Sequence, residues 1–126
     1  MLDQLWHATT RGMISWYEIK IFIEHASIIS SDALHVLVGV GVWLIVALVS
    51  RRSVATWLPW LALFAAIAFN ELVDLWVEQW PDKAMQYGEG AKDVVLTMIL
   101  PTVLLLAVRL RPQLFGASPS RRKRAR

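Results

Sequence analysis

The stretch W-L-P-W-L-A-L-F-A-A-I-A-F-N-E-L-V-D-L-W, residues 57–76, decides the fold of this chain. It carries no charged residue as far as Phe69, and then Asn70, Glu71 and Asp74 follow within two helical turns. An apolar run of this length predicts a helix that crosses a membrane. Ionisable groups inside such a helix are expensive, so they indicate a functional site that faces protein or water.

Two further apolar stretches accompany the central one. The first runs from Ala33 to Ser50 and contains Gly39 and Gly41, and the last runs from Val94 to Leu110. Each is close to the length needed to cross a hydrocarbon core of about 30 Å. Small residues such as glycine let neighbouring helices approach closely in a membrane, so we expect a helix contact at the two glycines.

These stretches define the fold class. The chain of 126 residues is 56% hydrophobic and only 18% charged, which is too apolar for a soluble domain of this size. The sequence predicts an all-α integral membrane protein, with three transmembrane helices in residues 32–110 and a central span over 54–77. Between the last two spans, residues 78–93 contain Pro81 and two glycines and are predicted to form a loop.

Residues 1–31 have a different character from the three spans. Bulky and charged side chains alternate there at roughly helical spacing, and tryptophan and tyrosine suit the headgroup zone of a bilayer. We expect an amphipathic helix, or two, lying in the membrane interface. The alternative is a poor spanning helix from Met13 to Ile29, which would have to bury residues such as Glu18 and Lys20.

The charge distribution predicts an orientation. Seven basic residues and no acidic ones lie between Arg109 and Arg126, and Arg51 and Arg52 lie between the first two spans. By the positive-inside rule this side is cytoplasmic, and the N-terminus and the acidic segment 78–93 lie outside. Residues 111–126 are predicted to be a disordered cytoplasmic tail near anionic lipid headgroups, rather than a nucleic-acid-binding segment.

This topology brings polar residues from three segments to one membrane depth. They lie at the outer ends of the spans. Polar residues distributed by chance would not all fall on the same side of the membrane, so their common placement indicates a site. We expect three of them to be catalytic, namely Glu71, His35 and Asp93, and four to bind a ligand, namely Asp32, Asn70, Asp74 and Lys92.

The chemistry follows from the spacing of these residues. Glu71 and Asp74 share one helix face, and two carboxylates in a low dielectric cannot both ionise cheaply, which suits a general acid and base, or a proton or cation site. Asp32 beside His35 could fix the tautomer of the imidazole. Lys92 is the candidate to bind an anion such as a phosphate or carboxylate. Each group could instead serve only to cap or lock helices.

Some chemistry is excluded by composition. The chain has no cysteine, so it has no disulfide, no thiolate nucleophile and no cysteine-based metal site. His35, Glu71, Asp74 and Asp93 could supply nitrogen and oxygen ligands, but no metal-binding motif supports them. We therefore predict no metal site and no cofactor.

Three short motifs resemble the VanZ-like family of small bacterial membrane proteins. They are D-A-L-H at 32–35, N-E-L-V-D at 70–74 and G-A-K-D-V at 90–94. The resemblance implies a bacterial inner-membrane protein, distantly linked to low-level resistance against lipoglycopeptide antibiotics. The sequence departs from the family at Asp74, where glutamine is frequent, at Lys92, where the basic residue is usually an arginine placed earlier, and in its weak N-terminal segment.

Three functions fit these observations. The first is an outward-facing pocket that binds or modifies a lipid, lipid-linked or anionic headgroup. The second is a structural or assembly protein whose polar cluster only locks the helices, and the third is a holin-like pore-former. Three spans offer little shelter for a pocket, so a homo-oligomer is plausible.

Overall fold

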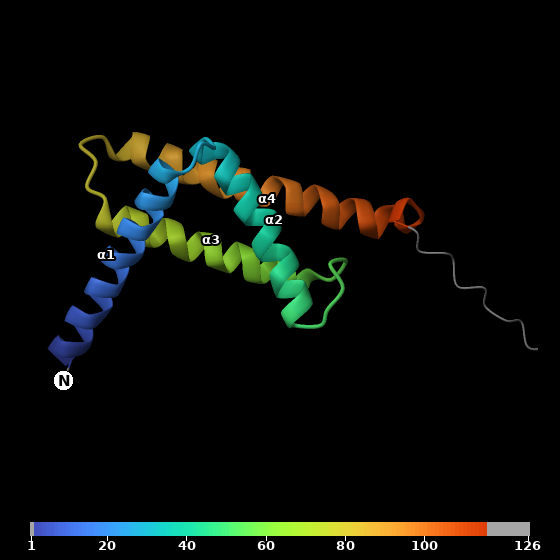
Figure 1. Ribbon diagram of the computed structural model, residues 1–126, viewed down its shortest axis with the longest axis horizontal. Coiled ribbons are helices and arrows are strands. Elements are labelled where there is room, and N and C mark those ends of the chain that lie inside the picture. The colour runs from blue at the N-terminus through green and yellow to red at the C-terminus, as the bar shows by residue number, and fades with distance from the viewer. Residues whose placement is uncertain (1, 116–126) are drawn as a thin grey trace, which may run out of the picture.

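The computed structural model describes residues 2–115, and this part of the chain is helical and contains no strand. Figure 1 shows its elements, which are α1 (Leu2–Ala26), α2 (Ser31–Val49), α3 (Trp57–Val77), α4 (Lys83–Leu110) and the 3₁₀ helix η1 (Pro112–Phe115). Three helices, α2, α3 and α4, are long and apolar enough to cross a membrane. The all-α prediction and the three apolar spans are confirmed.

The three long helices pack on one another in alternating directions. The first turns of α2 lie beside the third and fourth turns of α4, and the end of α3 meets the beginning of α4 (Figure 1). Helices α2 and α4 therefore run the same way, and α3 runs against both. Helix α1 lies against the C-terminal end of α3, where Trp6 also packs edge-to-face on Trp76. The first turn of α1 projects away from the bundle (Figure 1).

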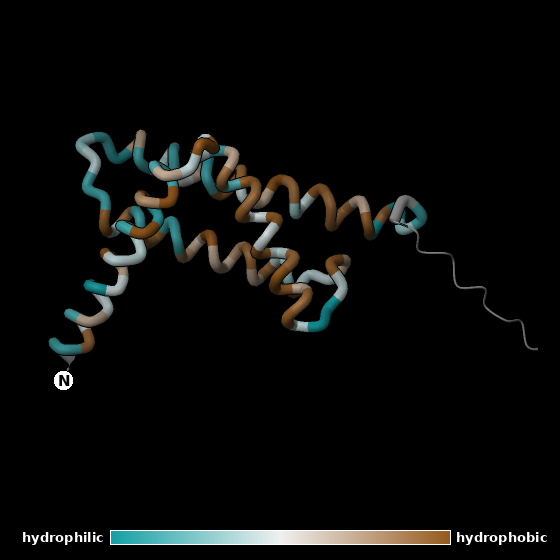
Figure 2. The backbone as a smooth tube through the Cα atoms, viewed as in Figure 1, coloured by the Kyte–Doolittle hydropathy of each residue, from teal (hydrophilic) through white to brown (hydrophobic). Residues whose placement is uncertain are grey.

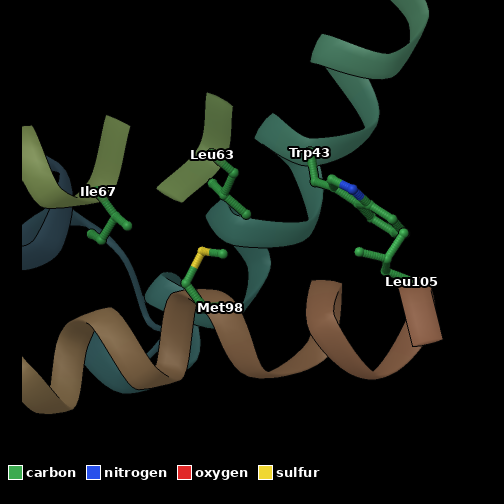
Figure 3. Close-up of a cluster of buried hydrophobic side chains, with 5 residues drawn as sticks. All are labelled: Trp43, Leu63, Ile67, Met98 and Leu105. Carbon is green, nitrogen blue, oxygen red and sulfur yellow. The ribbon is translucent and has the colours of Figure 1, made fainter. Parts of the chain in front are cut away.

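A narrow hydrophobic core holds the three long helices together. Figure 3 shows its buried members, which are Trp43 from α2, Leu63 and Ile67 from α3, and Met98 and Leu105 from α4. Many large apolar side chains of the same helices are exposed on their outer faces, such as Leu44, Phe64 and Val103. Figure 2 shows the middle turns of these helices in brown, the colour of hydrophobic residues. A bundle that is hydrophobic inside and outside is typical of helices surrounded by lipid rather than water.

Helices α2 and α4 approach each other closely at Gly39. A Cβ atom at this position would lie 2.1 Å from the backbone oxygen of Thr97. At Gly41 a Cβ would meet nothing within 4 Å. The predicted close approach is therefore confirmed for Gly39 and wrong for Gly41, because the two positions point to different faces of the helix.

The predicted loop at residues 78–93 is wrong for most of its length. Helix α4 begins at Lys83, eleven residues before the predicted start at Val94. Asp82 explains the early start, because its carboxylate accepts hydrogen bonds from the backbone N–H groups of Ala84 and Met85. Such an N-cap satisfies donors that the first turn leaves free.

Both ends of the bundle differ in part from the prediction. Helix α1 is one continuous helix, and it is not among the helices apolar enough to span a membrane. Its place in the interface stays a prediction. In the predicted disordered tail, Pro112–Phe115 form a 3₁₀ helix, and residues 116–126 lie outside the described part of the chain.

Candidate functional site

A cavity of about 600 Å³ lies between all four helices, at the end where α2 and α4 begin and α3 ends. Figure 2 shows this end of the molecule as a concentration of hydrophilic segments. All seven residues predicted from the sequence line the cavity, namely Asp32, His35, Asn70, Glu71, Asp74, Lys92 and Asp93. The fold thus brings together residues from three separate helices.

The cavity also has an apolar part. Leu63 and Ile67 of α3 line it opposite Val38 and Val42 of α2. Leu63 precedes Glu71 by two turns, so the apolar wall extends about 12 Å along α3 at 1.5 Å per residue. A single cavity therefore offers a polar end and an apolar end.

Lys92 is held by two carboxylates at the mouth of this cavity. Its Nζ lies 2.6 Å from Oε2 of Glu89, one turn earlier on α4, and 3.3 Å from Oδ1 of Asp32 on α2. All three side chains are about half exposed. Lys92 was expected to bind an anion, but its ammonium group already has two negative partners.

His35 joins α2 to two residues of α4. Its Nδ1 lies 3.2 Å from the hydroxyl of Thr97, and its Nε2 lies 3.4 Å from Oδ2 of Asp93. Asp93 and Thr97 are four residues apart and so share a helix face. A carboxylate, an imidazole and a hydroxyl are thus aligned, which is an arrangement that can move a proton along the series.

Glu71 is the most deeply buried of the predicted site residues, with 9% of its surface exposed. Its Oε1 accepts a hydrogen bond of 3.3 Å from the amide of Asn70. Its Oε2 packs against α4 at Gly90, where a Cβ atom would come within 2.8 Å of this oxygen. Within residues 2–115, no Lys, Arg or His pairs with this carboxylate.

Asp74 and Asn70 connect α3 to α1. The Asn70 amide donates to Asp74 at 3.1 Å, and its oxygen accepts from Nε1 of Trp16 at 3.1 Å. Lys20 forms an ion pair with Oδ2 of Asp74. The other oxygen of Asp74, Oδ1, is buried and has no hydrogen-bond partner among the described residues.

A second contact with α1 lies one turn beyond Asp74. The hydroxyl of Tyr17 donates to Oε1 of Glu78 at 2.6 Å, and Nε1 of Trp80 donates to Oε2 at 2.6 Å. The hydrogen bond to Glu78, with some burial, raises the pKa of Tyr17 to about 12. The Glu78 carboxylate is thereby fixed at the rim of the cavity.

Sequence reasoning missed the part that α1 plays in this site. Trp16 and Lys20 were recognised as members of an amphipathic segment, but not as neighbours of Asn70 and Asp74. Their spacing of four residues places them on one helix face. This shared face indicates that both side chains contact the same neighbouring surface. What the spacing could not reveal was the partner, which lies 54 residues away along the chain.

The described residues do not form a metal centre. Among residues 2–115, no group of three or more His, Cys, Asp or Glu side chains is positioned to hold a metal ion. The four candidate ligands, His35, Glu71, Asp74 and Asp93, line the same cavity. His35 of α2 lies next to Asp93 of α4, whereas Asp74 forms an ion pair with Lys20 of α1.

Comparison with known proteins adds no relative. No known protein family, no curated protein and no solved structure matches this chain. The functional argument therefore depends on the cavity and the groups around it.

Proposed function

We propose that this chain is an integral protein of the bacterial inner membrane whose cavity binds, and can modify, the headgroup of a lipid or lipid-linked molecule. One observation carries the proposal, which is a cavity with polar walls at one end and apolar walls along about 12 Å of α3. Amphiphiles have this same division, with a polar headgroup attached to hydrocarbon. Ligand sites between the helices of a bundle are a common arrangement.

The charges at the two ends support an outward-facing cavity. Arg51 and Arg52 follow α2, and the guanidinium of Arg109 near the end of α4 donates to the backbone oxygen of Ala55 at 3.0 Å. These basic residues lie at the opposite end from the cavity, and the positive-inside rule places them in the cytoplasm. The cavity then opens toward the outer leaflet, with the N-terminus outside.

The resemblance to the VanZ-like family supports the same residues. The matching positions Asp32, His35, Glu71, Lys92 and Asp93 all line the cavity. The distant link of that family to resistance against lipoglycopeptide antibiotics is consistent with a ligand at the membrane. The resemblance supports the location of the site more than any particular reaction.

Filling the apolar end of the cavity tests the proposal. Ala66 and its neighbour Ala65 are both exposed, but only Ala66 lines the cavity. Ala66→Trp should displace a bound hydrocarbon chain, and Ala65→Trp is the matched control with the same added bulk. The protein is purified from native membranes in mild detergent, and lipid that co-purifies is quantified by mass spectrometry.

The two variants give opposite expectations. Ala66→Trp should lose most of the co-purifying lipid, while Ala65→Trp retains the lipid of the unaltered chain. Equal lipid in all three proteins, or no bound lipid in the unaltered chain, would contradict the proposal. Circular dichroism shows whether each variant keeps its helices.

A second candidate function is purely architectural, and the pairing of the polar groups favours it. The contacts Asp32–Lys92 and His35–Asp93 both join α2 to α4, and interhelical polar contacts in membranes stabilise by about 0.6–2 kcal/mol each. If this is the whole role, Asp93→Asn should lower the amount of protein in the membrane. Lipid bound per folded molecule should then be unchanged, whereas the binding proposal predicts a change in bound lipid at normal abundance.

A further inference from the structure

The cavity carries a large excess of acidic groups. Seven of its lining residues are Asp or Glu, and two are Lys. Both lysines are already used, since Lys20 pairs with Asp74 and Lys92 pairs with Asp32 and Glu89. An incoming anion would therefore meet several carboxylates and no free ammonium group from the described residues.

Two carboxylates that line the cavity are incompletely partnered by the described residues. Glu71 is nine-tenths buried, and among the described residues its one side-chain hydrogen bond comes from the neutral amide of Asn70. Oδ1 of Asp74, one turn further along α3, is buried and accepts no hydrogen bond from the described residues. A buried acceptor without a partner costs free energy that a suitable donor would recover.

We propose that the polar end of the cavity receives an ammonium group, with the Glu71 carboxylate as its counter-ion and Oδ1 of Asp74 as a second acceptor. The inference rests on the proposed lipid-binding function and narrows it to amphiphiles whose headgroup carries a positive charge. An ammonium group supplies up to three donors together with the missing charge. This inference changes the charge of the expected ligand group: the sequence predicts an anion bound by Lys92, whereas the cavity favours a cation bound by Glu71.

Gly90 provides the space that this arrangement needs. The Glu71 carboxylate lies so close to α4 that a side chain at residue 90 would collide with it. The carboxylate thus reaches the region between α3 and α4 while remaining part of the cavity wall. A charge held there is screened from bulk water, which strengthens its attraction for an opposite charge.

Two lipids that differ in one group test the inference. Dihexanoyl phosphatidylethanolamine and dihexanoyl phosphatidylglycerol share chains and phosphate, but only the first has an ammonium group. Each is titrated into the delipidated full-length protein in neutral detergent, and binding is measured by isothermal calorimetry. Free ethanolamine, which has the ammonium group without chains, is the third ligand.

The unaltered chain should bind the ethanolamine lipid at least about tenfold more tightly than the glycerol lipid, the factor expected for one charged hydrogen-bonding group. Glu71→Gln should remove most of this preference. Glu18→Gln is the control, because Glu18 is exposed on α1 and does not line the cavity. The comparison of lipids uses the unaltered chain, so it holds even if a variant does not accumulate.

The outcomes separate this inference from the proposed function. Equal binding of both lipids, tighter binding of the glycerol lipid, or an unchanged preference in Glu71→Gln would overturn the ammonium inference and leave lipid binding intact. Free ethanolamine binding as tightly as its lipid would support the ammonium site and contradict the lipid function. Absence of binding by all three ligands would overturn both.

Discussion

Replacing Gly39 by alanine should force α2 away from α4. The added Cβ would lie 2.1 Å from the backbone oxygen of Thr97 and 2.9 Å from its carbonyl carbon. Both atoms belong to helix backbone, so they cannot rotate aside as the end of a flexible side chain could. His35 lies one turn before Gly39 and contacts the hydroxyl of Thr97 at 3.2 Å, so the same displacement disturbs the candidate site.

The size of the effect follows from this geometry. An ordinary contact begins at 3.4 Å, so the backbone at Thr97 must move by about 1.3 Å relative to Gly39. Overpacking of this kind costs about 1–3 kcal/mol. Alanine also favours a helix over glycine by up to about 1 kcal/mol, which offsets part of that cost.

Gly41→Ala is the matched control, because the same substitution there meets nothing within 4 Å. Reversible unfolding in mixed micelles, with increasing denaturing detergent, measures the free energy of unfolding of both variants. Gly39→Ala should be less stable than Gly41→Ala, which should equal or exceed the unaltered chain. A difference between the two variants below about 0.5 kcal/mol, the range of neutral surface changes, would refute the close approach of α2 and α4.

Two further predictions concern the polar end. Gly90→Ala should displace the Glu71 carboxylate and weaken binding of the ethanolamine lipid in calorimetry. Gly88→Ala is the control, because an added Cβ there meets nothing within 4 Å, and it should leave binding unchanged. Equal binding by both variants would contradict the contact between Glu71 and Gly90. Glu78→Gln should lower the pKa of Tyr17 from about 12 toward 10.0, followed by tyrosinate absorbance. Because the folded pKa is raised, this bond stabilises the fold below pH 10 and is lost as the pH rises through about 12. An unchanged titration would refute the hydrogen bond.

The spans could be predicted because lipid imposes a simple rule on sequence. Long runs without charge must be helical where the backbone has no water to bond with, and the runs at Ala33–Ser50 and Val54–Val77 are close to α2 and α3. The alternating directions of three spans then determine which helix ends are neighbours. This was enough to place Asp32, Glu71 and Asp93 at one end of the bundle.

The beginning of α4 could not be predicted because local signals pointed the other way. Two glycines between Pro81 and Val94 indicate a loop when the sequence is read alone. In the structure Gly90 lies at a contact between helices, since the carboxylate of Glu71 from α3 occupies the space of its missing side chain. A glycine chosen for tertiary packing looks the same in sequence as a glycine chosen for a turn.

The contribution of α1 was hidden for a different reason. None of its residues from 3 to 26 is buried, so its apolar pattern does not identify a partner. At the site it contacts α3 through polar groups, Trp16 with Asn70 and Lys20 with Asp74, and Trp6 adds an edge-to-face contact with Trp76. Pairings of this kind depend on the orientation of two helices, which amphipathic periodicity does not specify.

The distribution of partners bears on whether the cluster is architecture or a binding site. Lys92 and His35 join α2 to α4, and Lys20 joins α1 to α3, so each of these three side chains connects two helices. Glu71 is different, because it is the most buried of the predicted site residues and no cation among residues 2–115 pairs with it. A glutamine could make the same hydrogen bond with Asn70 at a lower desolvation cost. A carboxylate at this position is therefore explained better by a positively charged ligand than by helix packing.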